Sequence, residues 1–347
     1  MILLAAPAPP PIVVGEAIPV PVLKGVIERP GGVLLGANRK DGALIVRLSR
    51  DGGQTWRDQG VAARSERPDL GDGNLVALRD GSLALTYRDN RRPESAIRVV
   101  RSRDGGRTWG APETIAENDR GLWAPFLLAP RDGSLLAFYD DEAWPAREGR
   151  PGHQWIAMRR WTPKTKAWSD PVVASRRPDR PGRTDLARDG MFAAIETRPG
   201  RLLGVVEDVD PEEPRPSGIY SNVSPDGGRT WGWARGERPV LFRPRWPHMA
   251  VAPALGRLPD GRLLCAFGTD EGREGTVRSG TPVHQMPLET WGALSSDEGR
   301  TWGAAFPLHR GTARDYLAAL TPRRGGLWLN VLDFDRGPLL IPISIRR

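Results

Sequence analysis

Ser49-Arg-Asp51-Gly-Gly-Gln-Thr-Trp56 is the first of four copies of one phrase, S-x-D-x-G-x-T-W, in a chain of 347 residues. The other copies occupy residues 102–109, 224–231 and 295–302. In each copy the Ser and Asp side chains can hydrogen-bond the backbone of a tight turn, and glycine permits a positive φ. The Thr and Trp then begin the next strand. One such phrase predicts a turn, whereas four predict a repeated structural unit.

The spacing of the copies predicts six units. Successive aspartates of the phrase lie about 53, 122 and 71 residues apart, so the long middle gap holds two units. A degenerate copy lies in that gap, with Trp168 where the Trp of the phrase is expected. Short hydrophobic runs also flank D-G, P-G or G-G pairs, a pattern typical of β-hairpins. There are six such hairpins, which begin near residues 30, 79, 131, 198, 259 and 324.

Each unit therefore has four strands, with a hairpin turn after the first and the S-x-D-x-G-x-T-W turn after the third. Such units arranged radially form a propeller. The sequence predicts an all-β fold, a six-bladed β-propeller of four-stranded antiparallel blades, as a single domain over residues 1–347. We expect almost no helix, and an N-terminal strand within residues 11–20 that completes the last blade and closes the ring. The expected blades span about residues 22–65, 66–117, 118–178, 179–243, 244–309 and 310–347.

The amino-acid composition limits the kinds of binding partner to be expected. The net charge of +8 is compatible with a polyanionic partner. However, only four residues are Lys and the arginines form no run, so we expect no nucleic-acid partner. No apolar stretch is long enough to span a membrane, and residues 1–6 are too short for a signal peptide. The single cysteine, Cys265, is expected to be a buried thiol. We expect a monomer.

Cofactors and metals are not expected from the sequence. The four histidines, His153, His248, His284 and His309, are scattered without the spacing of metal ligands. No cluster of carboxylates resembles a calcium-binding loop.

A propeller brings corresponding strand ends from all blades to one face. The S-x-D-x-G-x-T-W turns join third and fourth strands and should lie on the opposite face. A carbohydrate site suits the first face, because carboxylates act at the anomeric carbon while arginine, asparagine and aromatic side chains hold the sugar. Any one of these charged residues alone is better explained as a solvated loop residue, but their convergence from five blades onto one face favours a site. The candidate residues, at starts of first strands and ends of second strands, are Arg39, Asp72, Asn74, Arg88, Trp123, Asp140, Glu142, Arg188, Asp189, Glu207, His248, Asp270, Arg314, Asp315 and Tyr316.

Several phrases carry a family resemblance over about 200 residues. They are Gly-Asp-Gly-Asn-Leu-Val-Ala-Leu at 71–78, Gly-Leu-Trp-Ala-Pro at 121–125, Ala-Arg-Asp-Gly-Met at 187–191 and the strand ends at residues 142 and 207. These phrases resemble the exo-1,5-α-L-arabinanases of glycoside hydrolase family 93, within the sialidase superfamily. The opening phrase is similar to the Asp-box, or BNR, repeat of that superfamily.

The resemblance implies an exo-acting, retaining glycoside hydrolase that acts on an oligosaccharide or polysaccharide. It places the general acid/base at Glu142 and the nucleophile at Glu207, with Tyr316 as a hydrogen-bonding or stacking residue. It also implies a secreted or periplasmic protein. Physical reasoning adds two expectations: like charge from Asp140 and Asp141 raises the pKa of Glu142, and Arg188 keeps Glu207 ionised. Retention needs the two carboxyl groups roughly 5–5.5 Å apart.

Two alternatives remain open. An exo-α-sialidase would use Tyr316 as the nucleophile, with Asp189 near its partner position, and would need a cluster of three arginines for the substrate carboxylate. The place where sialidases carry an opening arginine reads Ile18-Pro-Val-Pro21, without one, although Arg39, Arg88, Arg188 and Arg314 could rebuild such a cluster. The third class is a non-catalytic carbohydrate-binding propeller, because a fold does not fix a function.

Overall fold

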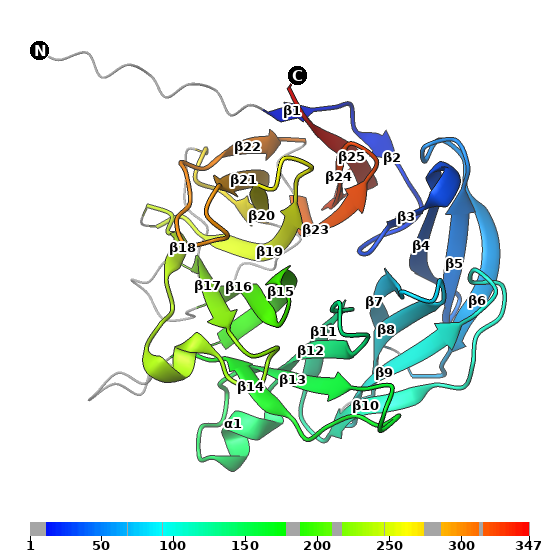
Figure 1. Cartoon of the computed structure of the whole chain (residues 1–347), viewed down its shortest axis with the longest axis horizontal. Helices are drawn as coiled ribbons and strands as arrows, with labels where there is room; N and C mark the ends of the chain where they lie inside the picture. The colour runs from blue at the N-terminus through cyan, green and yellow to red at the C-terminus, as the bar shows by residue number, and fades with distance from the viewer. Residues whose placement is uncertain are drawn as a thin grey trace, which may run out of the picture.

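The computed structural model describes residues 12–67, 69–91, 93–177, 188–209, 217–245, 247–273, 286–311 and 315–346. These residues form six antiparallel sheets arranged around a central axis (Figure 1). The predicted all-β, six-bladed propeller is therefore confirmed. No helix in the described part of the chain is long and apolar enough to cross a membrane.

The first three blades are built from consecutive strands. Blade one contains β3 (Ile27–Arg29), β4 (Val33–Lys40), β5 (Ala43–Ser49) and β6 (Arg57–Arg64). Blade two contains β7 (Asp69–Ala77), β8 (Leu83–Asn90), β9 (Ser95–Ser102) and β10 (Glu113–Asn118). Blade three contains β11 (Leu122–Leu128), β12 (Leu135–Asp141), β13 (Trp155–Trp161) and β14 (Val172–Ser175).

The remaining blades complete the ring. Blade four contains β15 (Arg188–Arg198), β16 (Arg201–Val209), β17 (Gly218–Ser224) and β18 (Val240–Phe242). Blade five contains β19 (Ala250–Arg257), β20 (Leu263–Thr269), β21 (Glu289–Ser295) and β22 (Phe306–His309). Blade six contains β23 (Asp315–Arg323), β24 (Gly326–Asp333), β25 (Gly337–Ile345) and β1 (Ile12–Val14). The helical segments are α1 (Ala143–Arg147) and the short 3-10 turns η1 (Pro30–Gly32) and η2 (Gly232–Arg235).

Both ends of the chain contribute to blade six. Strand β1 pairs antiparallel with β25, with Val13 opposite Ser344. Figure 1 shows these two strands side by side, one in blue and one in red. The short strand β2 (Ile18–Pro19) also pairs with β25. The predicted closure of the ring by the N-terminal strand is confirmed.

The repeated turns have the hydrogen bonds that their sequence predicts. In the first copy, Gly53 N donates to Ser49 Oγ at 2.9 Å and Thr55 N donates to Asp51 Oδ1 at 2.9 Å. The indole Nε1 of Trp56 donates to Gly53 O at 2.9 Å, so the ring packs under the turn. The copies that begin at residues 102 and 224 repeat this pattern.

The hydrophobic core lies between neighbouring blades. Most clusters of buried side chains join two blades, as when Leu136 and Phe138 of blade three pack against Phe192 and Trp231 of blade four. Cys265 lies buried in the cluster between blades four and five, as predicted. Because both faces of every blade are covered in this way, polar side chains gather at the strand ends around the axis.

A β-bulge near the start of the first strand recurs around the ring. The pairing register shifts at Asp72, Ala124, Met191 and Ala252, each of which has a φ between 42° and 53°. Left-handed backbone in a non-glycine residue is strained and persists only where its surroundings hold it. Such a bulge re-aims neighbouring side chains and backbone N–H groups. In four blades, the bulge therefore changes the direction of one backbone N–H group and one side chain, and these four bulges lie at equivalent positions around the ring.

The S-x-D-x-G-x-T-W turns are called box turns. The tryptophan of the third box turn is expected to stabilise the interface of blades three and four. Trp231 is 1% exposed and packs edge-on against Phe138 and Phe192, with ring centroids 5.9 and 5.6 Å away. We expect Trp231→Ala to lower the free energy of unfolding by about 3–5 kcal/mol in denaturant titrations. The control is Trp109→Ala, which removes the same turn hydrogen bond from a half-buried indole and should cost less. Equal losses would contradict an effect of packing.

Candidate active site

A cavity of about 550 Å³ opens where blades two, three and four meet blade six. Its walls come from the starts of β7, β11, β15 and β23 and the ends of β8, β12 and β16, on the face opposite the box turns. Eight of its residues belong to the predicted set, and Ala124, Gln154 and Met191 do not. The lining residues are Asp72, Arg88, Trp123, Ala124, Asp140, Glu142, Gln154, Arg188, Met191, Glu207 and Tyr316.

Three of these side chains occupy one register position in successive blades. Arg88 stands opposite Gly71, Asp140 opposite Trp123 and Glu207 opposite Gly190, in each case just before the bulge. Since strand ends converge on the axis, blades two, three and four present these groups to the same space. The propeller geometry thus brings together residues that are far apart in the sequence.

The bulges also hold the carboxyl groups. Ala252 N, in the bulge of blade five, donates to Glu207 Oε2 of blade four at 2.6 Å. The Met191 amide, in the bulge of blade four, favours the ionised form of Asp140 of blade three and so opposes the rise of its pKa. Glu207 is therefore fixed by the backbone of the next blade, and Asp140 is affected by the equivalent amide of its own neighbour.

Burial makes two of the carboxyl groups hard to ionise. Glu207 is 8% exposed, and burial raises its pKa to about 7 against the opposing effect of the Ala252 amide and Arg188. Burial and then the negative charge of Glu207 raise the pKa of Asp140 well above its usual range. Both carboxyl groups therefore hold their protons to a higher pH than they would in water.

Glu142 has different surroundings. It immediately precedes α1, and its Oε1 accepts from Arg188 Nη2 at 2.6 Å. The same nitrogen lies 2.7 Å from Gln154 Oε1, and Gln154 Nε2 donates to Asp140 Oδ2 at 3.2 Å. A hydrogen-bonded chain thus connects Glu142 to Asp140. Arg188 was expected to hold Glu207 ionised, but its ion pair is with Glu142.

Arg88 and Tyr316 form other parts of the wall. Arg88 is ion-paired with Asp72 and with Asp69, at 2.8 Å for the latter, and its guanidinium lies over the Trp123 ring at 5.4 Å. Burial and the charges of Glu207, Asp72 and Asp140 raise the pKa of Tyr316 well above its usual value. The phenol of Tyr316 is therefore a hydrogen-bond donor at neutral pH.

Three predicted site residues link blades instead of lining the cavity. Asn74 Oδ1 accepts from Leu127 N at 2.8 Å, which joins blades two and three. Asp189 is fully buried, in an ion pair with Arg238 of its own blade at 2.6 Å, and its Oδ2 accepts from Ser175 Oγ of blade three at 2.6 Å. Asp315 accepts from Thr290 of blade five. These polar groups were correctly placed at strand ends, but their side chains turn into the blade interfaces.

The predicted residues His248, Asp270 and Arg39 do not line this cavity. Asp270 accepts from Met249 N at 2.7 Å and stands 3.4 Å from His248 Nδ1. Arg39 lines a neighbouring cavity of about 400 Å³, which shares Asp72 with the first. Arg314 lies outside the described residues.

Gln154 was not among the predicted site residues, because those came only from the ends of first and second strands. Gln154 precedes β13, a third strand, and third strands begin on the same face as second strands end. Met191 and Ala124 were missed as lining residues because nothing in their residue types signals a bulge. The phrase that contains Met191 was noticed only for its resemblance.

Comparison with known proteins supports the fold. No protein-family model matches the chain, and no curated protein matches it. Similar solved structures include an α-L-arabinanase from Penicillium chrysogenum complexed with arabinobiose, at 19% identity, 97% and 99% coverage of the two chains and a TM-score of 0.66. An α-L-arabinofuranosidase from Fusarium graminearum, with an iminosugar inhibitor, gives 17% identity, 96% and 93% coverage and 0.65. A protein of unknown function from Dyadobacter fermentans gives 15% identity, 97% and 100% coverage and 0.66. The chain thus has a propeller fold like that of family 93 enzymes.

The raised pKa of Glu207 predicts a pH-dependent effect of its replacement. Below pH 4.5, the usual pKa, both folded and unfolded chains hold this proton. Between pH 4.5 and about 7 only the folded chain keeps it, so this group makes wild-type stability fall as the pH rises. We expect the free energy of unfolding of Glu207→Gln, relative to wild type, to rise by about 3 kcal/mol across this window. Denaturant titrations at a series of pH values measure it, and a flat difference would contradict the raised pKa.

Proposed function

We propose that the protein is an exo-acting, retaining glycoside hydrolase that releases terminal sugar units from an oligosaccharide or polysaccharide. The observation that carries the proposal is one cavity in which a buried, proton-retaining Glu207 and an arginine-paired Glu142 stand together. Glycoside hydrolysis requires such a difference, because one carboxyl group must donate a proton while the other is negatively charged.

The surroundings of the two glutamates favour the opposite roles from those that the resemblance implies. Glu207 has a pKa near 7 and suits the general acid, which protonates the glycosidic oxygen as the bond to the anomeric carbon breaks. Glu142, ion-paired with Arg188, suits the nucleophile that bonds to the anomeric carbon. Water, deprotonated by Glu207, then releases the sugar and restores Glu142. The neighbouring Asp140 favours the protonated form of Glu207, because two negative charges in one cavity repel each other.

The remaining wall suits an uncharged sugar. Trp123 offers an aromatic face, and Arg188 offers N–H donors for hydroxyl groups. A volume of about 550 Å³ falls in the range of small-ligand sites and suits a chain end. The similar Penicillium chrysogenum structure contains arabinobiose. We therefore propose arabinan or arabino-oligosaccharides as the first substrates to test.

A sialidase receives less support from the same geometry. Two arginines line the described cavity, and Arg88 and Arg188 are both engaged with carboxylates. The pKa of Tyr316 is raised, whereas a tyrosine nucleophile needs ready ionisation. Asp189 is engaged with Arg238 in a blade interface, so it does not serve as the partner of Tyr316.

The decisive measurement is hydrolysis of debranched arabinan, arabino-oligosaccharides and nitrophenyl glycosides, beside a sialic acid substrate. We expect release of sugars from chain ends with retained anomeric configuration by NMR. Glu142→Gln and Glu207→Gln should each lower kcat on natural substrates by about 10²–10⁴-fold. Glu196→Gln, at the opposite face, is the matched control. Tight sugar binding without turnover would instead establish a carbohydrate-binding propeller.

Leaving-group dependence separates the roles of the two glutamates. A dinitrophenyl leaving group needs no protonation, so Glu207→Gln should retain much of its activity on that substrate and Glu142→Gln should not. A fluorosugar inactivator should label Glu142. Labelling of Glu207, with activity rescued in Glu142→Gln, would reverse the two assignments.

A further inference from the structure

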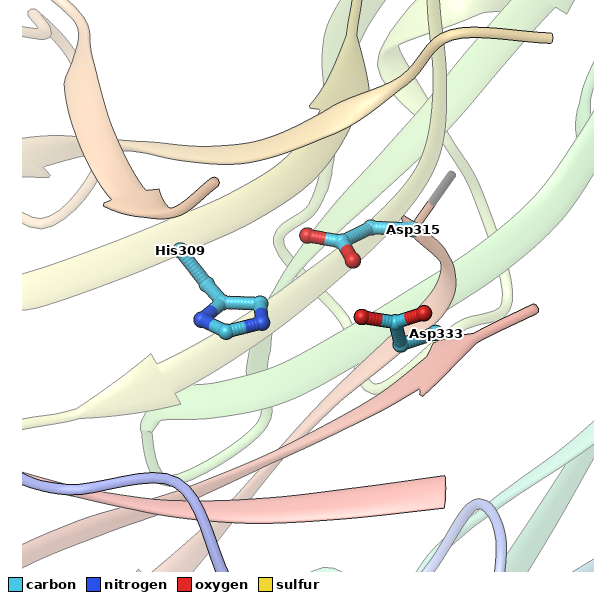
Figure 2. A group of neighbouring side chains, drawn as sticks. All are labelled: His309, Asp315 and Asp333. Atoms are coloured by element: carbon cyan, nitrogen blue, oxygen red, sulfur yellow. The ribbon is translucent and has the colours of Figure 1, made fainter. Parts of the chain in front are cut away.

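Three potential metal ligands converge at the junction of blades five and six. His309 ends β22 of blade five, while Asp315 begins β23 and Asp333 ends β24 of blade six (Figure 2). One nitrogen and two carboxylate oxygens from these residues all lie within 4.8 Å of one another. Sequence spacing gave no sign of this group, because the three residues come from three strands of two blades.

The three atoms surround one point beside the backbone. A β-carbon built on Gly311, which has a φ of 42°, would stand 2.8 Å from Asp333 Oδ2, 2.8 Å from His309 Nε2 and 3.0 Å from Asp315 Oδ1. These are the three nearest atoms there beyond the neighbours of Gly311 in the chain. The space that glycine leaves next to the backbone is therefore lined by ligand atoms.

Two of the atoms have no other hydrogen-bonding role among the described residues. Asp315 is 1% exposed, and its Oδ2 accepts from Thr290 N at 3.2 Å and Thr290 Oγ1 at 3.1 Å. Its Oδ1, which faces the shared point, has no hydrogen-bond partner, and neither has His309 Nε2. An unsatisfied buried carboxylate oxygen is costly, so this arrangement favours a bound cation.

Blade four contains the same pair of aspartates with a cation in place. Asp189 stands opposite Asp208 across β15 and β16, just as Asp315 stands opposite Asp333 across β23 and β24. Arg238 bridges the blade-four pair, with Nη2 at 2.6 Å from Asp189 Oδ1 and Nη1 at 2.9 Å from Asp208 Oδ2. Two carboxylates at this register thus hold a positive charge between them.

We propose that His309, Asp315 and Asp333 bind one divalent transition-metal ion, preferably Zn²⁺. A divalent ion balances two carboxylates, and the imidazole favours Zn²⁺ over Ca²⁺, which takes six to eight oxygen ligands. Tetrahedral zinc with ligand distances of about 2.0–2.2 Å places its ligand atoms about 3.4 Å apart. The three atoms here, which all lie within 4.8 Å of one another, would draw closer together around the ion. One protein nitrogen and two oxygens leave a fourth position for water.

The bound ion would link blade five to the wall of the candidate active-site cavity. Asp315 immediately precedes Tyr316, which lines that cavity, and Asp315 N donates to Leu288 O of blade five at 2.9 Å. Metal binding therefore fixes the start of β23 from both sides. The inference does not depend on the proposed function, since metal content is its readout.

Metal content and thermal stability test the site. The full chain is stripped with EDTA, loaded with Zn²⁺, freed of excess metal by gel filtration and analysed by elemental mass spectrometry. We expect one Zn²⁺ per wild-type chain and a higher Tm than in EDTA. His309→Ala and Asp315→Asn should lose both the metal and the Tm increase while keeping the circular dichroism spectrum of a folded β protein. The matched control is His248→Ala, which removes another histidine beside a buried aspartate and should keep the zinc.

Two results would overturn the proposal. One is wild-type protein that takes up no stoichiometric Zn²⁺ or Mn²⁺, and the other is uptake that His309→Ala leaves unchanged. A variant of Arg314, which is next to Asp315 in the sequence, provides a further test. If Arg314→Ala binds zinc and the wild type does not, a guanidinium occupies the cation position and the metal assignment is wrong.

Discussion

Every part of this molecule depends on the packing of each blade against its two neighbours. A single four-stranded sheet with two apolar faces is unstable in water, and only a closed ring covers all of those faces. The buried clusters accordingly lie between blades, as with Phe138, Phe192 and Trp231. The same constraint gathers the polar groups near the axis, where strands end and side chains from several blades meet.

The candidate site depends on this packing and on the β-bulge that recurs around the ring. A bulge near the start of the first strand recurs in blades two to five, and in blade five it turns the Ala252 amide toward Glu207 of the preceding blade. Because the carboxyl group is buried by the same packing, its pKa rises to about 7. The position of Glu207 and its readiness to hold a proton thus share one structural cause. Glu142, just beyond the end of β12, is more exposed and takes an arginine partner instead.

The sequence predicted the fold well because its signals are local. Ser49, Asp51 and Trp56 interact within eight residues, so a phrase in the sequence corresponds to a turn in the structure. Residues at strand ends could be predicted from strand order for the same reason. The direction of each side chain could not be predicted, because it depends on bulges and on partners in another blade. Asp189 and Asp140 lie at comparable strand ends, yet one faces Arg238 and the other faces the cavity.

Closure of the ring by β1 and β25 has a consequence for how the chain folds. Strand β1, the first strand of the propeller, must wait for β25, the last, before either can complete blade six. Tyr316 belongs to that blade, so the cavity is finished only when the two ends meet. Contacts of such long sequence separation form slowly. Blades one to five can pack in order during synthesis, whereas the binding surface matures only after β25 has been made.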